Sequence, residues 1–463
     1  MDITLLVINW SSVGLKVAQL LLSLSILVIL HEFGHYITAR WFGCRIEKFY
    51  LFFDPWFSIV KKKIGETVYG IGWLPLGGYV KIAGMIDESM DKEALKLPPQ
   101  PWEFRSKPAW QRLIIMIGGV TVNVLLAFLI YAMILFVWGE KKTLNSSLKQ
   151  GVWVTDSLMH EIGLRNGDKI VSINDKEEKY FEDIPKRILF GGGTAIKVNR
   201  DGRDTIINIP MAIIGKLVEK KRSKVPLLLQ RVPAFVGEFD KKDTSNANKA
   251  GLQYRDKIVK VDSLPVQYLD EMTAYNDGHK NSRVMYTVER NGAAVTIPVT
   301  IDVDGKTGMP FLKDKQYDSL GAYKLEIRKF GFFESFPAGV NRTFSSLNDY
   351  IEQFKLIFKP STGAYKGVGG FKSMGSIFAG NTWDWESFWR ITAFFSIVLA
   401  FMNLLPIPAL DGGHVLFTLG EMITGRKPNE KFLEYAQIFG MVILLALMLY
   451  ANGNDWFGWG KGK

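Results

Sequence analysis

The sequence contains a single cysteine, Cys44, among 463 residues. One cysteine cannot form an internal disulfide or build a cysteine-rich zinc module. Small domains stabilised by disulfides or by cysteine-bound zinc are therefore excluded. Histidine is also scarce, with five residues in the chain. Hydrophobic residues make up 48% of the chain and charged residues 22%, which excludes both a disordered protein and a bundle made only of membrane helices. This composition predicts membrane spans combined with soluble domains.

Four apolar stretches reach the roughly 20 residues that a membrane-spanning helix needs. They lie within Ile3–Leu30 and at Leu113–Gly139, Ile391–Leu410 and Tyr435–Asn454. The first stretch opens without a basic segment, which argues against a cleaved signal peptide. The sequence therefore predicts a polytopic α-helical membrane protein with four transmembrane helices.

The formal net charge of +11 would suggest a nucleic-acid partner in a soluble protein, but here lysine and arginine cluster beside the apolar stretches. They gather between the first and second stretches, as at Lys61–Lys63, and between the third and fourth. Cytosolic loops of membrane proteins are enriched in these residues. We therefore predict a lipid partner and no nucleic acid, with both termini and Glu140–Arg390 on the extracytoplasmic side.

The predicted extracytoplasmic segment contains an internal repeat. Gly163–Val171 returns as Gly251–Val259, and Val198–Gly202 returns as Val288–Gly292. Each copy predicts a turn, a short strand and a hairpin, so we expect two copies of one β-rich domain. The pattern resembles PDZ domains, which bind peptides at a sheet edge. A rigid spacer that binds nothing is the alternative, and in the second copy Arg255 replaces the turn glycine.

The chain is predicted to divide into five parts. These are an N-terminal membrane part at 1–139, a first PDZ-like domain at 140–225, a second at 226–325, an amphipathic extracytoplasmic helix with its linker at 326–389, and a C-terminal membrane part at 390–463. The amphipathic helix is predicted because apolar residues recur every three or four positions from Phe336 to Phe358. It would lie in the membrane interface, cover the mouth of a site, or pack against the repeated domains.

The chemistry is predicted at the cytosolic end of the first span, in the sequence HEFGH from His31 to His35. Two histidines four positions apart on a helix face the same side and are able to hold one Zn²⁺, with Glu32 between them as the general base. A cluster of this kind next to hydrocarbon is costly to keep without a function. The alternative is a histidine pair at a helix end that lipid headgroups satisfy.

A hydrolytic zinc site uses three protein ligands and keeps one position open. The segment from Asn403 to His414 supplies two candidates for the third ligand, Asp411 and His414. Pro406 and Pro408 must break the third span just before them, which is tolerated at membrane depth where the backbone lines a wet cavity. We favour Asp411 because it comes first and paired glycines follow it.

Short β-forming pieces around glycine and proline between Glu66 and Lys81 predict hairpins instead of a fifth span. A peptide bond inside a helix must be unwound before it is cut. An unpaired strand edge beside the metal helix would bind the freed backbone groups.

Together these motifs, with PLGGYVK before span two and NLLPIPALDGGH in span three, resemble the site-2 protease family of intramembrane zinc metalloproteases. The resemblance is to the bacterial regulator-of-sigma-E protease (RseP) type with tandem PDZ domains. It implies one Zn²⁺ bound by His31, His35 and Asp411, and Glu32 as catalytic acid and base. It also implies substrate binding by Asn403 and by a membrane-associated β-hairpin at Gly70–Lys81, with the residues Gly70, Gly72, Leu76, Gly77, Gly78 and Tyr79.

The resemblance further implies a bacterial inner-membrane enzyme, with its active site near the cytosolic side. Such an enzyme cleaves transmembrane segments of single-pass proteins, such as anti-sigma factors and remnant signal peptides, after another protease has trimmed them outside. Leu51–Pro55 and Gly118-Gly119 depart from the family pattern, which bears on substrate preference. The alternative function is a non-enzymatic PDZ-bearing receptor or scaffold, in which a fourth protein ligand closes a structural metal site.

Overall fold

The computed structural model describes residues 10–75, 77–85, 98–190, 195–210, 213, 216–217, 226–240, 243–380 and 382–459. The chain forms two compact units. We call residues 1–139, 329–355 and 368–463 the membrane unit, and residues 140–328 and 356–367 the repeat unit.

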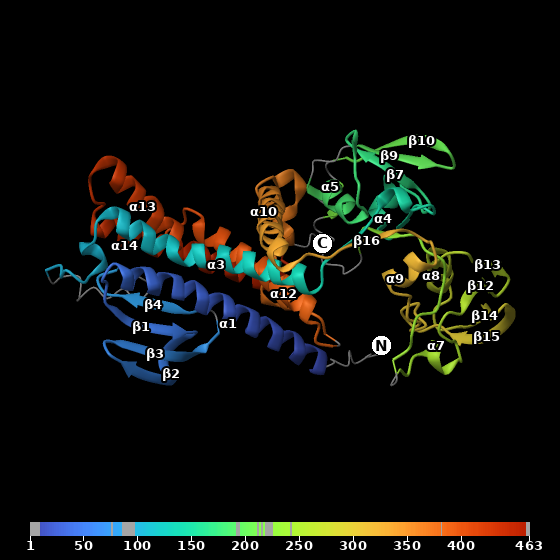
Figure 1. The fold of residues 1–463 in the computed structure, drawn as a ribbon, viewed down its shortest axis with the longest axis horizontal. Helices are drawn as coiled ribbons and strands as arrows, with labels where there is room; N and C mark the ends of the chain where they lie inside the picture. Colours follow the sequence, from blue (N-terminus) through green and yellow to red (C-terminus); the bar gives the residue numbers. More distant parts are fainter. Residues whose placement is uncertain are drawn as a thin grey trace. The chain divides into compact units, whose positions relative to one another are not determined.

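Within the described residues, four helices of the membrane unit are long and apolar enough to cross a membrane. They are α1 (Trp10–Trp41), α3 (Ala109–Val137), α12 (Trp385–Leu404) and α14 (Glu430–Phe457). Each overlaps one predicted apolar stretch; α12 ends at Leu404, before the predicted end at Leu410, and the part of the first stretch before Trp10 lies outside the described residues. Helix α3 runs beside both α1 and α12 (Figure 1).

Glycines bring α1 and α3 into close contact. A side chain at Gly34 of α1 would collide with the backbone carbonyl of Gly118 on α3. The next residue, Gly119, lies directly against the imidazoles of His31 and His35. The pair Gly118-Gly119 therefore sets the distance between the two helices at the depth of the HEFGH motif.

The third span ends where its prolines begin. Helix α12 stops at Leu404, before Pro406 and Pro408. The chain then starts a separate helix, α13 (Asp411–Thr424), which packs against α3. An ion pair between Arg112 Nη2 and Glu421 Oε1, at 2.5 Å, joins the start of α3 to α13.

A four-stranded sheet follows α1, with β1 at Ile46–Leu51, β2 at Phe53–Ile64, β3 at Thr67–Leu74 and β4 at Tyr79–Ile82. The strand order is β2-β3-β1-β4. Strands β2 and β3 form a hairpin, but β3 and β4 do not pair with each other. Instead β1 lies between them, parallel to β3 and antiparallel to β4. The prediction of a hairpin over Gly70–Lys81 is therefore wrong.

The sheet order has a steric cause and a functional consequence. A side chain at Gly70 would collide with the ring of Tyr50, so a glycine there lets β3 pack against β1. The chain after β3 then crosses to the far side of β1. Strand β4 becomes an edge of the sheet, and it lies next to α1 (Figure 1).

Helix α10 (Phe332–Ile357) matches the predicted amphipathic helix. Its aromatic side chains pack on the membrane unit: the rings of Phe344 and Phe128 on α3 are 5.7 Å apart, and those of Tyr350 and Phe401 on α12 are 5.5 Å apart. The apolar face of α10 therefore covers the second and third spans. The short helix α11 (Phe371–Ser376) precedes α12.

The repeat unit contains two four-stranded sheets of the same order, β10-β9-β7-β8 and β15-β14-β12-β13. Their strands are β7 (Lys169–Ile173), β8 (Lys176–Glu177), β9 (Ala195–Arg200), β10 (Arg203–Asn208), β12 (Lys257–Val261), β13 (Leu264–Pro265), β14 (Arg283–Arg290) and β15 (Ala293–Thr300). The helices of this unit include α4 (Ser157–Glu161), α5 (Ile184–Phe190), α7 (Asn246–Lys249), α8 (Leu269–Gly278) and α9 (Asp314–Ser319). One continuous apolar core fills the unit.

The turn before each sheet has the same backbone conformation in both copies. Gly167 has a φ of 92° and Arg255, its counterpart, a φ of 69°. Both residues donate their backbone N–H to the preceding strand segment, at Val152 and Val236, over 2.9 Å. The second copy therefore keeps the left-handed turn although it has lost the glycine that favours it.

Two strand pairs cross the domain boundaries predicted from sequence. Strand β11 (Leu228–Gln230) pairs with β6 (Val152–Val154) of the first copy, beyond the predicted boundary at residue 225. Strand β16 (Leu325–Arg328) pairs with β5 (Glu140–Thr143), so one two-stranded ribbon joins both ends of the segment.

Candidate metal centre

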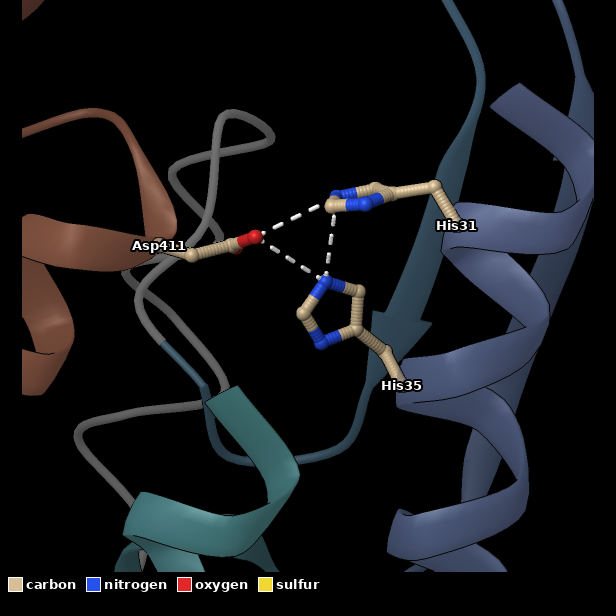
Figure 2. Close-up of side chains that lie close together, drawn as sticks. All are labelled: His31, His35 and Asp411. Carbon is tan, nitrogen blue, oxygen red and sulfur yellow. Dashed lines mark hydrogen bonds and ion pairs between the residues drawn. The ribbon is translucent and has the colours of Figure 1, made fainter. Parts of the chain in front are cut away.

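The centre begins with the two histidines of α1. His31 and His35 are one helical turn apart and both are buried. Their imidazoles project toward Asp411, the first residue of α13 (Figure 2). These three residues, from two elements far apart in the sequence, form a possible metal-binding group.

The three ligand atoms form a nearly equilateral triangle. Nε2 of His31 lies 3.3 Å from Nε2 of His35, and each nitrogen lies 3.2 Å from Oδ2 of Asp411. Nitrogen and oxygen ligands of a tetrahedral Zn²⁺, bound at about 2.0–2.2 Å, are separated by roughly 3.3–3.5 Å. Two imidazoles and one carboxylate are also a ligand set that catalytic zinc uses. The donors fit a zinc ion.

A hydrogen bond to the protein fixes the tautomer of His35. Its Nδ1 donates to the backbone carbonyl of Ile115 on α3 over 2.8 Å. The proton is then on Nδ1, and Nε2, which faces the triangle, keeps its lone pair for a metal. Metal-ligating histidines commonly make such a bond through their second nitrogen.

Two asparagines contact His31 at its two ring nitrogens. The amide nitrogen of Asn123 on α3 lies 3.1 Å from Nδ1, and that of Asn403 on α12 lies 3.0 Å from Nε2. Asn123 is fully buried, and its Oδ1 has no hydrogen-bond partner among the described residues. The oxygen and nitrogen of an amide are assigned from their hydrogen-bond partners. A 180° flip of the Asn123 amide would place its Oδ1 at His31, where it would accept a hydrogen bond from Nδ1–H.

Asp411 reaches the histidines through a constrained turn. The paired glycines that follow it pack against backbone: a side chain at Gly412 would collide with the carbonyls of Leu404 and Leu405, and one at Gly413 would come within 2.7 Å of the carbonyl of Ile407. The start of α13 therefore folds back closely onto the segment that ends α12. This close approach carries the Asp411 carboxylate to α1.

A cavity of about 550 Å³ opens beside the three residues. Glu32 lines it together with residues of the edge strand β4, among them Tyr79 and Val80. His414 also lines the cavity, but within the described part of the chain it does not belong to the three-residue group. The arrangement leaves room for a substrate and a water beside the ligands.

Some of the residues predicted to bind substrate lie at the cavity, and others do not. Gly78 and Tyr79 line the cavity, and Asn403 lies at His31. Gly70 and Gly72 do not reach the site, because they lie on β3 inside the sheet, where Gly72 packs on the backbone of Phe53. Gly77 faces the ring of Phe53, and Leu76 lies outside the described residues.

Sequence reasoning gave no role in the centre to Asn123, the carbonyl of Ile115, or Gln437 of α14, which lines the cavity. A polar residue inside an apolar span is the available signal for Asn123 and Gln437. A backbone carbonyl leaves no such signal.

The chain is similar to known metalloproteases. The model of peptidase family M50 matches residues 19–447, and the chain belongs to this family, the site-2 proteases. A "Putative zinc metalloprotease" of Neisseria meningitidis is 28% identical over 93% of this chain and 96% of its own length. A protein of the same description from Rickettsia conorii is 28% identical over 95% and 98%. The "Regulator of sigma-E protease RseP" of Salmonella typhimurium is 25% identical over 95% and 98%.

The family and the fold define the class of this protein. It is a zinc-dependent metalloendopeptidase. The four apolar helices among its described residues are those of a membrane protein. Its β-sheets lie in the repeat unit and beside α1.

Proposed function

We propose that the protein is an intramembrane endopeptidase that cleaves transmembrane segments of single-pass proteins in the inner membrane of a bacterium. One Zn²⁺ bound by His31, His35 and Asp411 would form its centre. The observation that supports the proposal is the triangle of ligand atoms, 3.2–3.3 Å on each side. It lies beside an edge strand, and both of its histidines are on α1, a helix long and apolar enough to cross a membrane.

The residues around the centre have different roles in the proposed reaction. A zinc ion bound there supplies Lewis-acid polarisation and lowers the pKa of water. Glu32 borders the same cavity and serves as the general base, taking a proton from the attacking water. Glu32 then passes this proton to the amine that leaves when the peptide bond breaks. Asn403 donates from its amide to the substrate at the open side of His31.

Strand β4 holds the substrate in an extended form. A helical peptide keeps its N–H and C=O groups paired internally, so it must unwind before its bond becomes accessible. The edge of β4 offers backbone partners to the unwound segment, in the manner of strand addition. Tyr79 borders the cavity at this edge, and Gly78 leaves space there because any side chain would come within 2.8 Å of Val28.

The expected substrates are anti-sigma factors and remnant signal peptides that another protease has already shortened outside the membrane. Support comes from the similarity to the Salmonella regulator of sigma-E protease and from the two similar β-sheets inside the repeat unit. The two copies, as PDZ-like domains on the extracytoplasmic side, would bind peptides or exclude proteins with bulky outer domains.

The test uses membranes that contain the full-length wild type or the E32Q variant, with a tagged single-pass helix that carries a minimal outer domain. E352Q is a matched control, because Glu352 is partly exposed on α10 and forms an ion pair with Lys355 of the same helix. Cleavage by wild type and E352Q, absent in E32Q and abolished by a zinc chelator, supports the proposal. Equal cleavage by wild type and E32Q overturns the mechanism.

A further inference from the structure

We propose that Gln437, on the fourth span, is a positioning residue that holds the turn carrying Asp411 and thereby sets the geometry of the metal centre. The inference rests on the proposed role of Asp411 as a zinc ligand. It gives the fourth span, which supplies none of the proposed ligands, a specific task in the reaction.

Gln437 differs from the residues around it on α14. The helix is apolar enough to span a membrane, and most of its residues are at least partly exposed in the structure. Gln437 is only 5% exposed. A polar side chain within a membrane span is costly and is retained where it has a buried partner or lines a wet cavity. Gln437 meets both conditions, because it also lines the cavity beside the metal ligands.

The partner of Gln437 is the backbone of the turn between α12 and α13. The backbone N–H of Ala409 donates to Oε1 of Gln437 over 3.1 Å. Ala409 has a φ of 84°, in the left-handed region that residues with a side chain rarely adopt. Such a conformation persists only where the surrounding structure holds it in place. The hydrogen bond that Gln437 accepts is therefore placed where the turn needs support.

A second residue of α14 contacts the same turn. Gly440, three positions after Gln437, lies against the carbonyl of Pro408 so closely that no side chain would fit. The pair Gln437 and Gly440 thus contacts two consecutive residues of the turn, and Asp411 follows two positions later. Displacement of this turn would move the Asp411 carboxylate, whose Oδ2 lies 3.2 Å from Nε2 of both histidines.

Gln437 contacts the turn and not a ligand atom, so its effect must pass through the turn. Removing the acceptor in Q437L should release Ala409 from the left-handed conformation and loosen Asp411. Residues that orient metal ligands typically change metal affinity by about 10–100-fold when mutated. If Q437L acts by releasing the strained residue, A409G should compensate, because glycine adopts a positive φ without a penalty.

The experiment uses the purified full-length protein in detergent, with five variants: Q437L, A409G, the double variant A409G/Q437L, F439L and D411N. F439L is the control, because Phe439 is on the same helix and is mostly exposed. Zinc retention is measured by competition with a chelator. The visible absorption of the cobalt-substituted protein reports ligand geometry independently of activity.

We expect Q437L to hold zinc about 10-fold more weakly and to show an altered cobalt spectrum. A409G/Q437L should regain most of the loss, and F439L should match wild type. Unchanged zinc retention and spectrum in Q437L would overturn the inference, and so would a loss that A409G does not restore, since this would indicate general damage to α14. D411N separates the two proposals: if it binds zinc as wild type does, the proposed metal centre itself is wrong.

Discussion

The side-chain amide of Asn123, in the middle of the second span, lies 3.1 Å from Nδ1 of His31. The other ring nitrogen of the same histidine faces His35, Asp411 and Asn403. His31 is therefore held from two sides by different helices. Asn123 fixes the orientation of the ring, whereas Asn403 lies on the side of the ligand atoms.

This difference predicts two distinct defects. N123L should lower zinc affinity by about 10–100-fold, because His31 loses the group that orients its ring. N403L should lower kcat/KM while leaving zinc affinity close to that of wild type, because Asn403 is proposed to act on substrate. Chelator competition together with kinetics on one tagged substrate separates the two effects. Full zinc retention in N123L would contradict the assigned role of Asn123.

Gly119 predicts a steric test of the centre. A methyl group at this position would contact the His35 ring and come within 2.6 Å of Cε1 of His31. G119A should therefore displace the ligands, lose most of the bound zinc, and destabilise the protein by about 1–3 kcal/mol, as overpacked cores do. Metal content and thermal unfolding measure the two effects. G420A on α13 is the matched control, since its added methyl meets no atom within 4 Å, and a similar loss of zinc in G420A would refute the steric explanation.

The repeated ion pairs predict equal effects in the two copies. Arg200 binds Asp168, and Arg290 binds Asp256, in each case through two hydrogen bonds of 2.6–2.8 Å to a carboxylate that is almost fully buried. R200M and R290M would each leave a buried carboxylate without its partner, at a cost of about 3 kcal/mol in unfolding free energy. Hydrogen exchange of β7 and β12 would locate the loss.

The control for these pairs is K197M, because the pair of Lys197 with Asp204 is about half exposed. Exposed pairs contribute less than about 1 kcal/mol. Loss of protection in K197M as large as in R200M would show that burial of the carboxylate is not the cause.

Tyr286 predicts a dependence of stability on alkaline pH. Burial raises the pKa of its hydroxyl to about 12, against an opposing effect of the hydrogen bond to Asn276. In the unfolded chain the pKa is about 10, so the neutral form is favoured by folding. The contribution is complete below pH 10 and is lost as the pH rises from about 10 to about 12, because the unfolded state ionises first. Y286F should make the stability curve shallower in this range, and identical curves for the two proteins would contradict the prediction.

The proposed orientation of the chain predicts a labelling pattern. In a C44S background, N291C is at a hairpin tip of the repeat unit and R426C is between α13 and α14. A membrane-impermeant maleimide should label N291C in intact spheroplasts and R426C only after lysis. The reverse pattern would invert the topology.

Sequence alone predicted the parts of the fold that depend on local patterns. Runs of apolar residues located the four long helices, and the break after Leu404 followed from Pro406 and Pro408. The spacing of His31 and His35 defined half of the centre because a helix fixes the geometry of positions four apart. The repeat was visible because both copies keep a Gly-Leu pair, an Asp-Lys-Ile-Val segment and the arginine that binds the buried aspartate.

What depends on non-local pairing was not predictable in the same way. The pieces around Gly70 and Tyr79 look like neighbours in a hairpin, yet β1 lies between them, since strand order is decided by packing across the sheet. The roles of Asn123, Ile115 and Gln437 depend on which residues of other helices lie opposite them. No periodicity within one segment contains that information.

The ribbon of β5 and β16 has a consequence for how the protein is built. Because Thr143 and Leu325 are paired partners, everything from residue 144 to residue 324 leaves and rejoins the chain at neighbouring points. This arrangement is typical of an inserted domain. Insertion of a domain is tolerated when its two ends lie close together, because the surrounding fold then has to change little. A short turn joining Thr143 to Leu325 would then yield a minimal membrane protein with the same chain ends, to which other domains of similar end spacing can be grafted.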